Sequence, residues 1–217
     1  MSAIEIKICG ITRGADALAA IELGAAIVGV NFYAGSPRCV TLQRAQEIAA
    51  AVAGRAKLVG VFVNMNVSEV LRIARAVPLD AVQLHGDESR QECAAVAKEF
   101  DVIRALKVDG EFSEERSAEF ADCSGLLLDT PSAGHGGSGE SFDWASVRWQ
   151  RVRSAAPSAR VFLAGGLHAD NIAEAIAMVH PDVVDVCSGV ESEKGIKSVN
   201  KMREFVAAVR AVERQER

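Results

Sequence analysis

The residues in this sequence best placed to do chemistry start with a cysteine near the N-terminus. Isoleucines alternate with polar residues over positions 4–8, a strand-like segment that ends in Cys9. Because strand side chains alternate between two faces, Lys7 shares a face with Cys9. An ammonium group beside a thiol lowers the thiol pKa, so Cys9 is a candidate catalytic residue and Lys7 a candidate tuning residue. The alternative is that Cys9 is a small buried apolar side chain.

A second candidate is a carboxylate that ends a later apolar run. Asp129 follows Leu126-Leu127-Leu128 and precedes a long glycine-rich segment. A loop that closes over a carboxyl group removes water from it, which raises the carboxyl pKa and suits it to act as a general acid. We expect Gly136, Gly137 and Gly139 to form this lid. The alternative is that Asp129 caps a turn or fixes the loop.

Two glycine turns have the character of anion sites. Gly165 and Gly166 follow one apolar run, and Ser188 and Gly189 follow the next. Backbone N–H groups are closely approachable at such turns, and barrel enzymes commonly bind phosphate after strands seven and eight. The sequence therefore predicts a phosphate site at these residues, although each glycine taken alone is also explained by a tight turn.

Three further polar residues are expected to contact a substrate. Arg38 follows Ser36-Pro37 and can hold a carboxylate with a two-pronged hydrogen bond. His85 either orients a substrate group or is a structural histidine of the rim. Asp185, in the last apolar run, is the third.

The elements that must position these residues follow a regular pattern. Strand-like aliphatic runs start near residues 4, 26, 57, 80, 102, 125, 160 and 183, and each is followed by a helix-like segment. Alternating strands and helices form parallel sheets, and eight units suggest an α/β fold of the (βα)8 TIM-barrel type, with residues 1–217 as a single domain. An open doubly wound sheet is the alternative.

A barrel places its chemistry at the carboxyl ends of its strands. The polar residues that follow the predicted strands would then surround one mouth, where they are poor for a core but useful for a site. Their joint position favours a catalytic role for Cys9. The residues expected there are Cys9, Asn31, Asn64, His85, Asp129 and Ser188.

The helices show ordinary start signals. Thr41, Asn66 and Asp87 are predicted N-caps, because their side-chain oxygens can accept hydrogen bonds from free backbone N–H groups of the first turn. In the first helix, Leu18 and Ile21 are expected to face inward.

Composition limits the classes of partner. There are 24 Lys and Arg residues against 29 Asp and Glu residues, a net charge of −5, which argues against nucleic acid or an anionic membrane surface as the partner.

The N-terminal residues lack a secretion signal, and no apolar run reaches the roughly 18 residues of a membrane span, so a cytoplasmic protein is expected. The five cysteines include no CxxC pair, which fits neither disulfides nor a zinc site, and no metal is expected.

Taken in order, the motifs resemble the phosphoribosylanthranilate isomerase family over essentially the whole chain. The resemblance is specific because several independent motifs occur in that family's order. They are Lys7–Thr12 (KICGIT), Ser36–Arg38 (SPR), Val61–Asn64 (VFVN), Gln83–Gly86 (QLHG), Leu128–Thr130 (LDT), Gly136–Gly139 (GGSG) with Phe142–Trp144 (FDW), Ala164–Leu167 (AGGL) and Ser188–Glu191 (SGVE).

This resemblance implies a cofactor-free Amadori rearrangement in tryptophan biosynthesis, with a phosphoribosyl derivative of anthranilate as the small-molecule substrate. It implies that Asp129 is the general acid that protonates the ring oxygen as the ribose opens to an iminium ion. Cys9 would be the base that removes the C2 proton. Arg38 would take the anthranilate carboxylate, and the two glycine turns would hold the phosphate.

Two other functions stay open at this point, as does the oligomeric state. One is a sugar-phosphate-binding barrel without catalysis, which the presence of both Cys9 and Asp129 argues against. The other is a different sugar-phosphate isomerase or an aldolase, for which Lys107 is the passable Schiff-base lysine.

Overall fold

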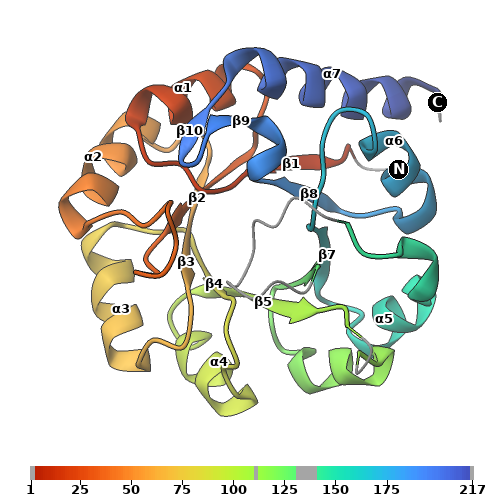
Figure 1. Ribbon diagram of the computed structural model, residues 1–217. Helices are drawn as coiled ribbons and strands as arrows, with labels where there is room; N and C mark the ends of the chain where they lie inside the picture. Colours follow the sequence, from red (N-terminus) through yellow and green to blue (C-terminus); the bar gives the residue numbers. More distant parts are fainter. Residues whose placement is uncertain (1–2, 110–111, 131–140, 216–217) are drawn as a thin grey trace.

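The strands close into one barrel (Figure 1). The computed structural model describes residues 3–109, 112–130 and 141–215. Its barrel strands are β1 (Glu5–Ile8), β2 (Ile27–Asn31), β3 (Lys57–Phe62), β4 (Ala81–Leu84), β5 (Asp101–Lys107), β6 (Gly125–Asp129), β7 (Arg160–Leu163) and β8 (Val183–Val186). They pair in parallel in sequence order, and β8 pairs back onto β1. The predicted (βα)8 barrel is confirmed, and the open sheet is wrong.

Helices surround the barrel on its outer side (Figure 1). They are α1 (Gly14–Glu22), α2 (Leu42–Val52), α3 (Val67–Ala76), α4 (Arg90–Val96), η1 (Glu114–Phe120), η2 (Trp144–Ser146), α5 (Trp149–Ala155), α6 (Ile172–Val179), η3 (Ser188–Val190) and α7 (Val199–Gln215). The connection from β5 to β6 holds a 3-10 helix, η1, in place of the α-helix expected there. Across the described ranges, no helix is long and apolar enough to cross a membrane.

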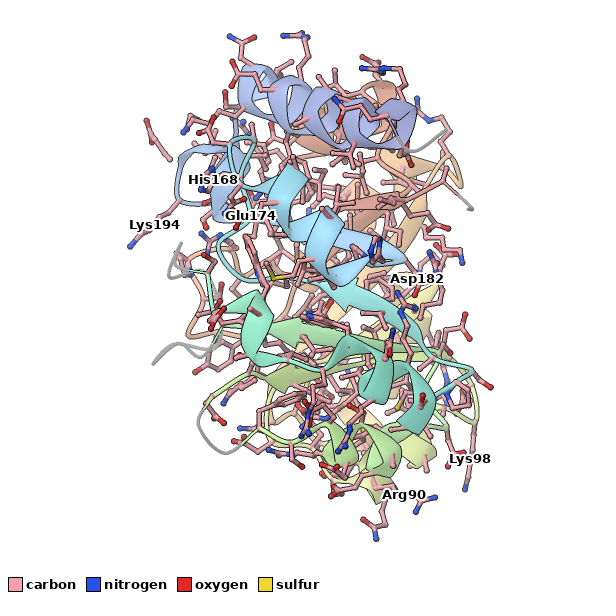
Figure 2. The ribbon with its side chains drawn as sticks, turned by 90° about the vertical axis from the view of Figure 1, so that its right-hand side faces the viewer. Arg90, Lys98, His168, Glu174, Asp182 and Lys194 are labelled. Atoms are coloured by element: carbon pink, nitrogen blue, oxygen red, sulfur yellow. The ribbon has the colours of Figure 1, made fainter. Side chains whose placement is uncertain are left out.

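The strands read as nearly continuous aliphatic runs because both of their faces are buried. Val59, Ile103, Leu127 and Phe162 belong to an apolar cluster of the barrel interior, while the other strand face packs into the larger core. Charged residues such as Arg90 lie on the outer surface (Figure 2). This pattern is why every observed strand starts within one residue of its predicted position.

Two of the predicted N-caps are confirmed and one is wrong. The side chains of Thr41 and Asn66 each accept a hydrogen bond from a backbone N–H of the first helical turn. Asp87 does not cap α4. The helix begins later because Ser89 and Glu92 form a capping box, which satisfies two backbone N–H groups at once.

The inward face of α1 differs from the predicted one. Ala17 and Ala20 are fully buried, whereas Leu18 is only half-buried and Ile21 packs partly against the core. The cause is the buried carboxylate of Asp16, which accepts a backbone N–H from the segment after β8 at 3.2 Å. This contact turns the Asp16 side of the helix toward the protein.

A hairpin that the sequence did not predict follows β8. Strands β9 (Glu191–Glu193) and β10 (Ile196–Lys197) pair antiparallel, and the turn between them includes Gly195 at a φ of +84°. The Thr12 hydroxyl, from the loop after β1, donates to the Gly195 carbonyl at 2.6 Å. The hairpin is thereby tied to the loop that follows Cys9.

A buried ion pair fixes the loop after β4. Glu88 accepts hydrogen bonds from Arg104 at 3.0 Å and from the backbone N–H groups of Gly86 at 2.8 Å and Asn64 at 2.7 Å. Both charged side chains are only 3% exposed. Since Gly86 follows His85 directly, this pair helps to position the end of β4.

Replacing Glu88 by Ala is expected to lower the free energy of unfolding by about 3–5 kcal/mol, because it leaves Arg104 buried and unpaired. Urea unfolding followed by circular dichroism measures the change. The control is Glu47→Ala, which removes an exposed ion pair with Arg44 and is expected to cost less than about 1 kcal/mol. Equal losses in the two variants would contradict the structural importance of the buried pair.

Candidate active site

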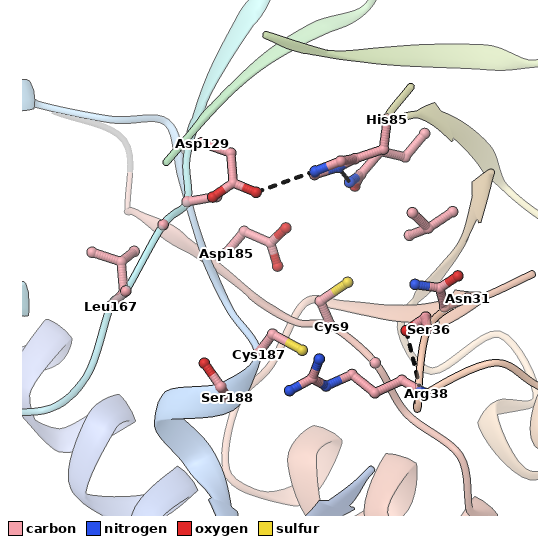
Figure 3. Close-up of a pocket in the computed structure, with 16 residues that line it drawn as sticks. Cys9, Asn31, Ser36, Arg38, His85, Asp129, Leu167, Asp185, Cys187 and Ser188 are labelled. Carbon is pink, nitrogen blue, oxygen red and sulfur yellow. Dashed lines mark hydrogen bonds and ion pairs between the residues drawn. The ribbon is translucent and has the colours of Figure 1, made fainter. Parts of the chain in front are cut away.

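A cavity opens at the carboxyl ends of the strands (Figure 3). Its lining comes from elements far apart in sequence, including the ends of β1, β4, β6 and β8 and the turn after β7. The structure therefore brings most of the predicted site residues together, while their roles stay predictions. These lining residues are Cys9, Asn31, Arg38, His85, Asp129, Gly165, Gly166, Asp185 and Ser188.

Some of the expected residues are not part of the cavity lining. Asn64 lies in the turn after β3, where its exposed side chain accepts the backbone N–H of Asp87 at 2.6 Å. Lys107 ends β5, and its Nζ lies 3.7 Å from an Asp87 oxygen. Gly189 packs against the backbone of Leu167, which leaves no room for a Cβ.

The residues expected to form a lid, Gly136, Gly137 and Gly139, lie outside the described part of the chain.

Lys7 is buried inside the barrel and carries a charge there. Its Nζ lies 2.6 Å from Asp185 Oδ2 and donates to Gln83 Oε1 at 2.8 Å. Burial alone would favour the neutral amine, but the attraction of Asp185 and of the Cys9 thiolate outweighs it and raises the pKa of Lys7. The side chain is therefore an ammonium group with no exposed surface.

Cys9 follows β1 and forms part of the cavity wall. Burial raises the pKa of the Cys9 thiol to about 12, and the attraction of Lys7 offsets this only in part. Lys7 thus acts in the predicted direction without bringing the thiol pKa below its ordinary value. The reason is that the free energy cost of removing water from the thiolate exceeds the stabilisation by the charge of one nearby ammonium group.

Asp129 ends β6 and faces His85. Its Oδ2 lies 3.2 Å from His85 Nε2 (Figure 3). Its Oδ1 accepts the backbone N–H of Thr130 at 2.8 Å. The other ring nitrogen of His85, Nδ1, lies 2.7 Å from Gln83 Nε2. His85 is therefore held at both ring nitrogens.

Arg38 makes its two-pronged contact within the protein. Its Nε and Nη2 each donate to a different oxygen of Glu191 at 2.8 Å, and both side chains are buried. Glu191 also accepts from Lys197 at 2.9 Å. Among the described residues, no hydrogen-bond partner reaches Arg38 Nη1, so the N–H groups of this nitrogen are left for a ligand.

The turns after β7 and β8 lie together at one side of the cavity. Gly165 and Gly166 have φ values of +86° and +61°, which favour glycine. A Cβ on Gly165 would also collide with Thr130 after β6. Ser188 begins η3 and faces the same cavity (Figure 3).

One buried oxygen at the cavity is unsatisfied. Asp185 Oδ2 is paired with Lys7, but within the described ranges no hydrogen-bond donor reaches Asp185 Oδ1. A buried carboxylate oxygen without a donor is costly. This atom is a free acceptor for an N–H or O–H group of a ligand.

Four residues of the site were missed by reasoning from the sequence: Gln83, Cys187, Glu191 and Lys197. Gln83 gave a signal, because it is a polar residue inside an otherwise apolar strand. Glu191 is the last residue of the Ser188–Glu191 motif, in which only Ser188 and Gly189 were predicted to bind a ligand. Nothing in the sequence pairs Glu191 with Arg38, which lies 153 positions away.

The site combines a thiol, a carboxylate held by a histidine, a free buried acceptor and two glycine turns after β7 and β8. The described residues contain no group of three or more His, Cys, Asp or Glu side chains that could hold a metal ion. Fold and site together define a (βα)8 barrel whose cavity gathers the thiol, carboxylate and histidine side chains typical of barrel enzymes that act on small molecules.

Comparison with known proteins identifies the family. The family model of N-(5'-phosphoribosyl)anthranilate (PRA) isomerase matches residues 6–208, and the chain belongs to this family. It is 46% identical to the N-(5'-phosphoribosyl)anthranilate isomerase of Stutzerimonas stutzeri over 214 residues, covering 98% of this chain and all of that one. The enzyme of the same name from Pseudomonas fluorescens is 47% identical over 212 residues, covering 97% of this chain and all of that one.

Solved structures agree with this assignment. The phosphoribosyl anthranilate isomerase of Thermus thermophilus superposes with a TM-score of 0.87 at 34% identity, covering 96% of this chain and 100% of that one. A phosphoribosyl anthranilate isomerase in complex with reduced 1-(o-carboxyphenylamino)-1-deoxyribulose 5-phosphate gives a TM-score of 0.84 at 35% identity, covering 96% and 99%.

The raised pKa of Cys9 predicts slow alkylation at neutral pH. The rate of iodoacetamide labelling at Cys9 should rise about tenfold per pH unit and keep rising toward pH 12, because only the thiolate reacts. Peptide mass spectrometry measures the rate, with the exposed Cys39 as the internal control. A plateau near the ordinary thiol pKa of about 8.5 would show that burial does not dominate.

Proposed function

We propose that this protein isomerises N-(5'-phosphoribosyl)anthranilate to 1-(2-carboxyphenylamino)-1-deoxyribulose 5-phosphate, the Amadori rearrangement of tryptophan biosynthesis. The observation that carries this proposal is that Cys9 and Asp129 line one cavity in a member of this family. The reaction moves protons within one molecule, so that C1 is reduced as C2 is oxidised. It needs no external electron acceptor.

Asp129 is the general acid of the proposed mechanism. It donates a proton to the ring oxygen of the ribose, the C1–O bond breaks, and the nitrogen lone pair forms an iminium ion with C1. The carboxylate left behind has His85 Nε2 at 3.2 Å and the Thr130 N–H at 2.8 Å. Both contacts stabilise the charge that appears when the proton leaves.

Cys9 is the base of the next step. Its thiolate removes the C2 proton, and the electrons of the C2–H bond form an enolamine that then tautomerises to the ketone. The thiol pKa of about 12 makes the thiolate strongly basic but scarce. The iminium charge of the intermediate favours the thiolate and acidifies the C2–H bond, so base and substrate are activated by the same cation.

The remaining contacts position the substrate. Arg38 Nη1, left free by Glu191, binds the anthranilate carboxylate. Asp185 Oδ1 accepts from a substrate N–H or hydroxyl group, which satisfies this buried oxygen. The phosphate is held at the two glycine turns by Gly165, Gly166 and Ser188, which line the cavity, and by the backbone N–H of Gly189, the residue that follows Ser188.

Cys9→Ser and Asp129→Asn should each lower kcat by about 100-fold to 10,000-fold, because each removes one proton-transfer group. The loss of phosphoribosylanthranilate fluorescence measures the rate. Cys39→Ser and Asp122→Asn are matched controls at exposed positions outside the cavity and should keep full activity. Full activity in both site variants would overturn the assignment, and an inert wild-type protein would favour a sugar-phosphate-binding barrel without catalysis.

A further inference from the structure

Gln83 is a buried polar residue whose role the proposed acid and base do not explain. It lies on β4 facing the barrel interior, and it is 1% exposed. Its amide sits between two groups of the site, with Oε1 2.8 Å from Lys7 Nζ and Nε2 2.7 Å from His85 Nδ1. A buried amide costs stability unless all of its polar atoms are used in this way.

Lys7 determines which way the Gln83 amide points. An ammonium group has only donors, so the amide atom that faces Lys7 must be the oxygen. Lys7 itself is fixed by Asp185 at 2.6 Å and has no exposed surface. Reversing the amide would place its NH2 group against the ammonium group, with two sets of donors in contact.

The orientation of the amide in turn determines the tautomer of His85. The Gln83 NH2 group can only donate, so Nδ1 of His85 must accept and carries no proton. The ring proton is then on Nε2, the nitrogen that lies 3.2 Å from Asp129 Oδ2. The opposite tautomer would present a lone pair to the carboxylate.

We propose that Gln83 is a positioning residue for the acid, and that Lys7, through Gln83, holds His85 in the tautomer with its proton on Nε2. The chain Asp185–Lys7–Gln83–His85–Asp129 links two carboxylates that both line the cavity. Lys7 therefore serves the acid as well as contacting the base. The effect on catalysis rests on the proposed function, whereas the tautomer does not.

The test is Gln83→Glu, a change of one atom in the side chain. A carboxylate accepts hydrogen bonds from both neighbours, so His85 must then carry a proton on Nδ1. Long-range 1H–15N correlation spectra of protein with 15N-labelled histidine distinguish protonated from unprotonated ring nitrogens. His85→Gln identifies the His85 signals, and spectra are recorded at and above neutral pH.

In the wild type we expect a proton on Nε2 and none on Nδ1, and in Gln83→Glu a proton on Nδ1. The same variant should lower kcat by about 10-fold to 100-fold with little change in KM, because a second carboxylate changes the protonation of His85 beside Asp129 but the substrate contacts remain. The control is Gln150→Glu, the same change at an exposed position of α5, which should alter neither the spectrum nor kcat.

If Gln83→Glu does not fold, Gln83→Met replaces it. Only Asp129 then favours a proton on Nε2, so a second population with the proton on Nδ1 should become detectable. A spectrum identical to that of the wild type would show that Asp129 alone fixes the tautomer, and it would overturn the role of Gln83. A proton on Nδ1 in the wild type would overturn the tautomer assignment. A changed tautomer with unchanged kcat would overturn the positioning role. An inert wild type with the proton on Nε2 would overturn the proposed function and leave the tautomer assignment intact.

Discussion

The buried ammonium group of Lys7 is the interaction on which the site depends. A charge inside a barrel is tolerated only when oxygen atoms replace its water, and Asp185 and Gln83 supply them at 2.6 and 2.8 Å. These two partners lie on β8 and β4, so one Nζ ties together strands that are not neighbours. The apolar side chains of the barrel interior hold the strands together by packing, whereas the charge of Lys7 fixes the orientation of Asp185 and Gln83 at the cavity.

The fold could be predicted because its signals are local. Each strand is an aliphatic run, several of the runs end at or next to a polar residue, and barrel geometry gathers those ends, so Cys9 and Asp129 could be placed at one mouth. The side of α1 that faces inward was not predictable, because it depends on a contact between Asp16 and the segment after β8. The cap of α4 was misassigned because Asp87 and Ser89, two residues apart, both have side chains suited to an N-cap.

The site was predictable where a residue acts alone and unpredictable where it acts through a partner. Arg38 was recognised as a group that binds a carboxylate, but its carboxylate is Glu191 of the same chain. Gln83 was visible as a polar residue in an apolar strand, but its partner Lys7 lies on another strand and could not be assigned to it. Pairings across 76 or 153 positions leave no trace in composition or periodicity.

The ion pairs at the cavity also affect how an anion arrives there. Lys7 is matched by Asp185, Arg38 and Lys197 share Glu191, and the chain as a whole carries a charge of −5. A phosphorylated ligand is therefore attracted only at short range, by the one positive charge that Arg38 and Lys197 retain after pairing with Glu191, while the net charge of −5 repels the ligand at long range. Added salt screens that repulsion, so the diffusional encounter should become faster as ionic strength increases, the reverse of the behaviour of a site lined by unpaired lysines and arginines.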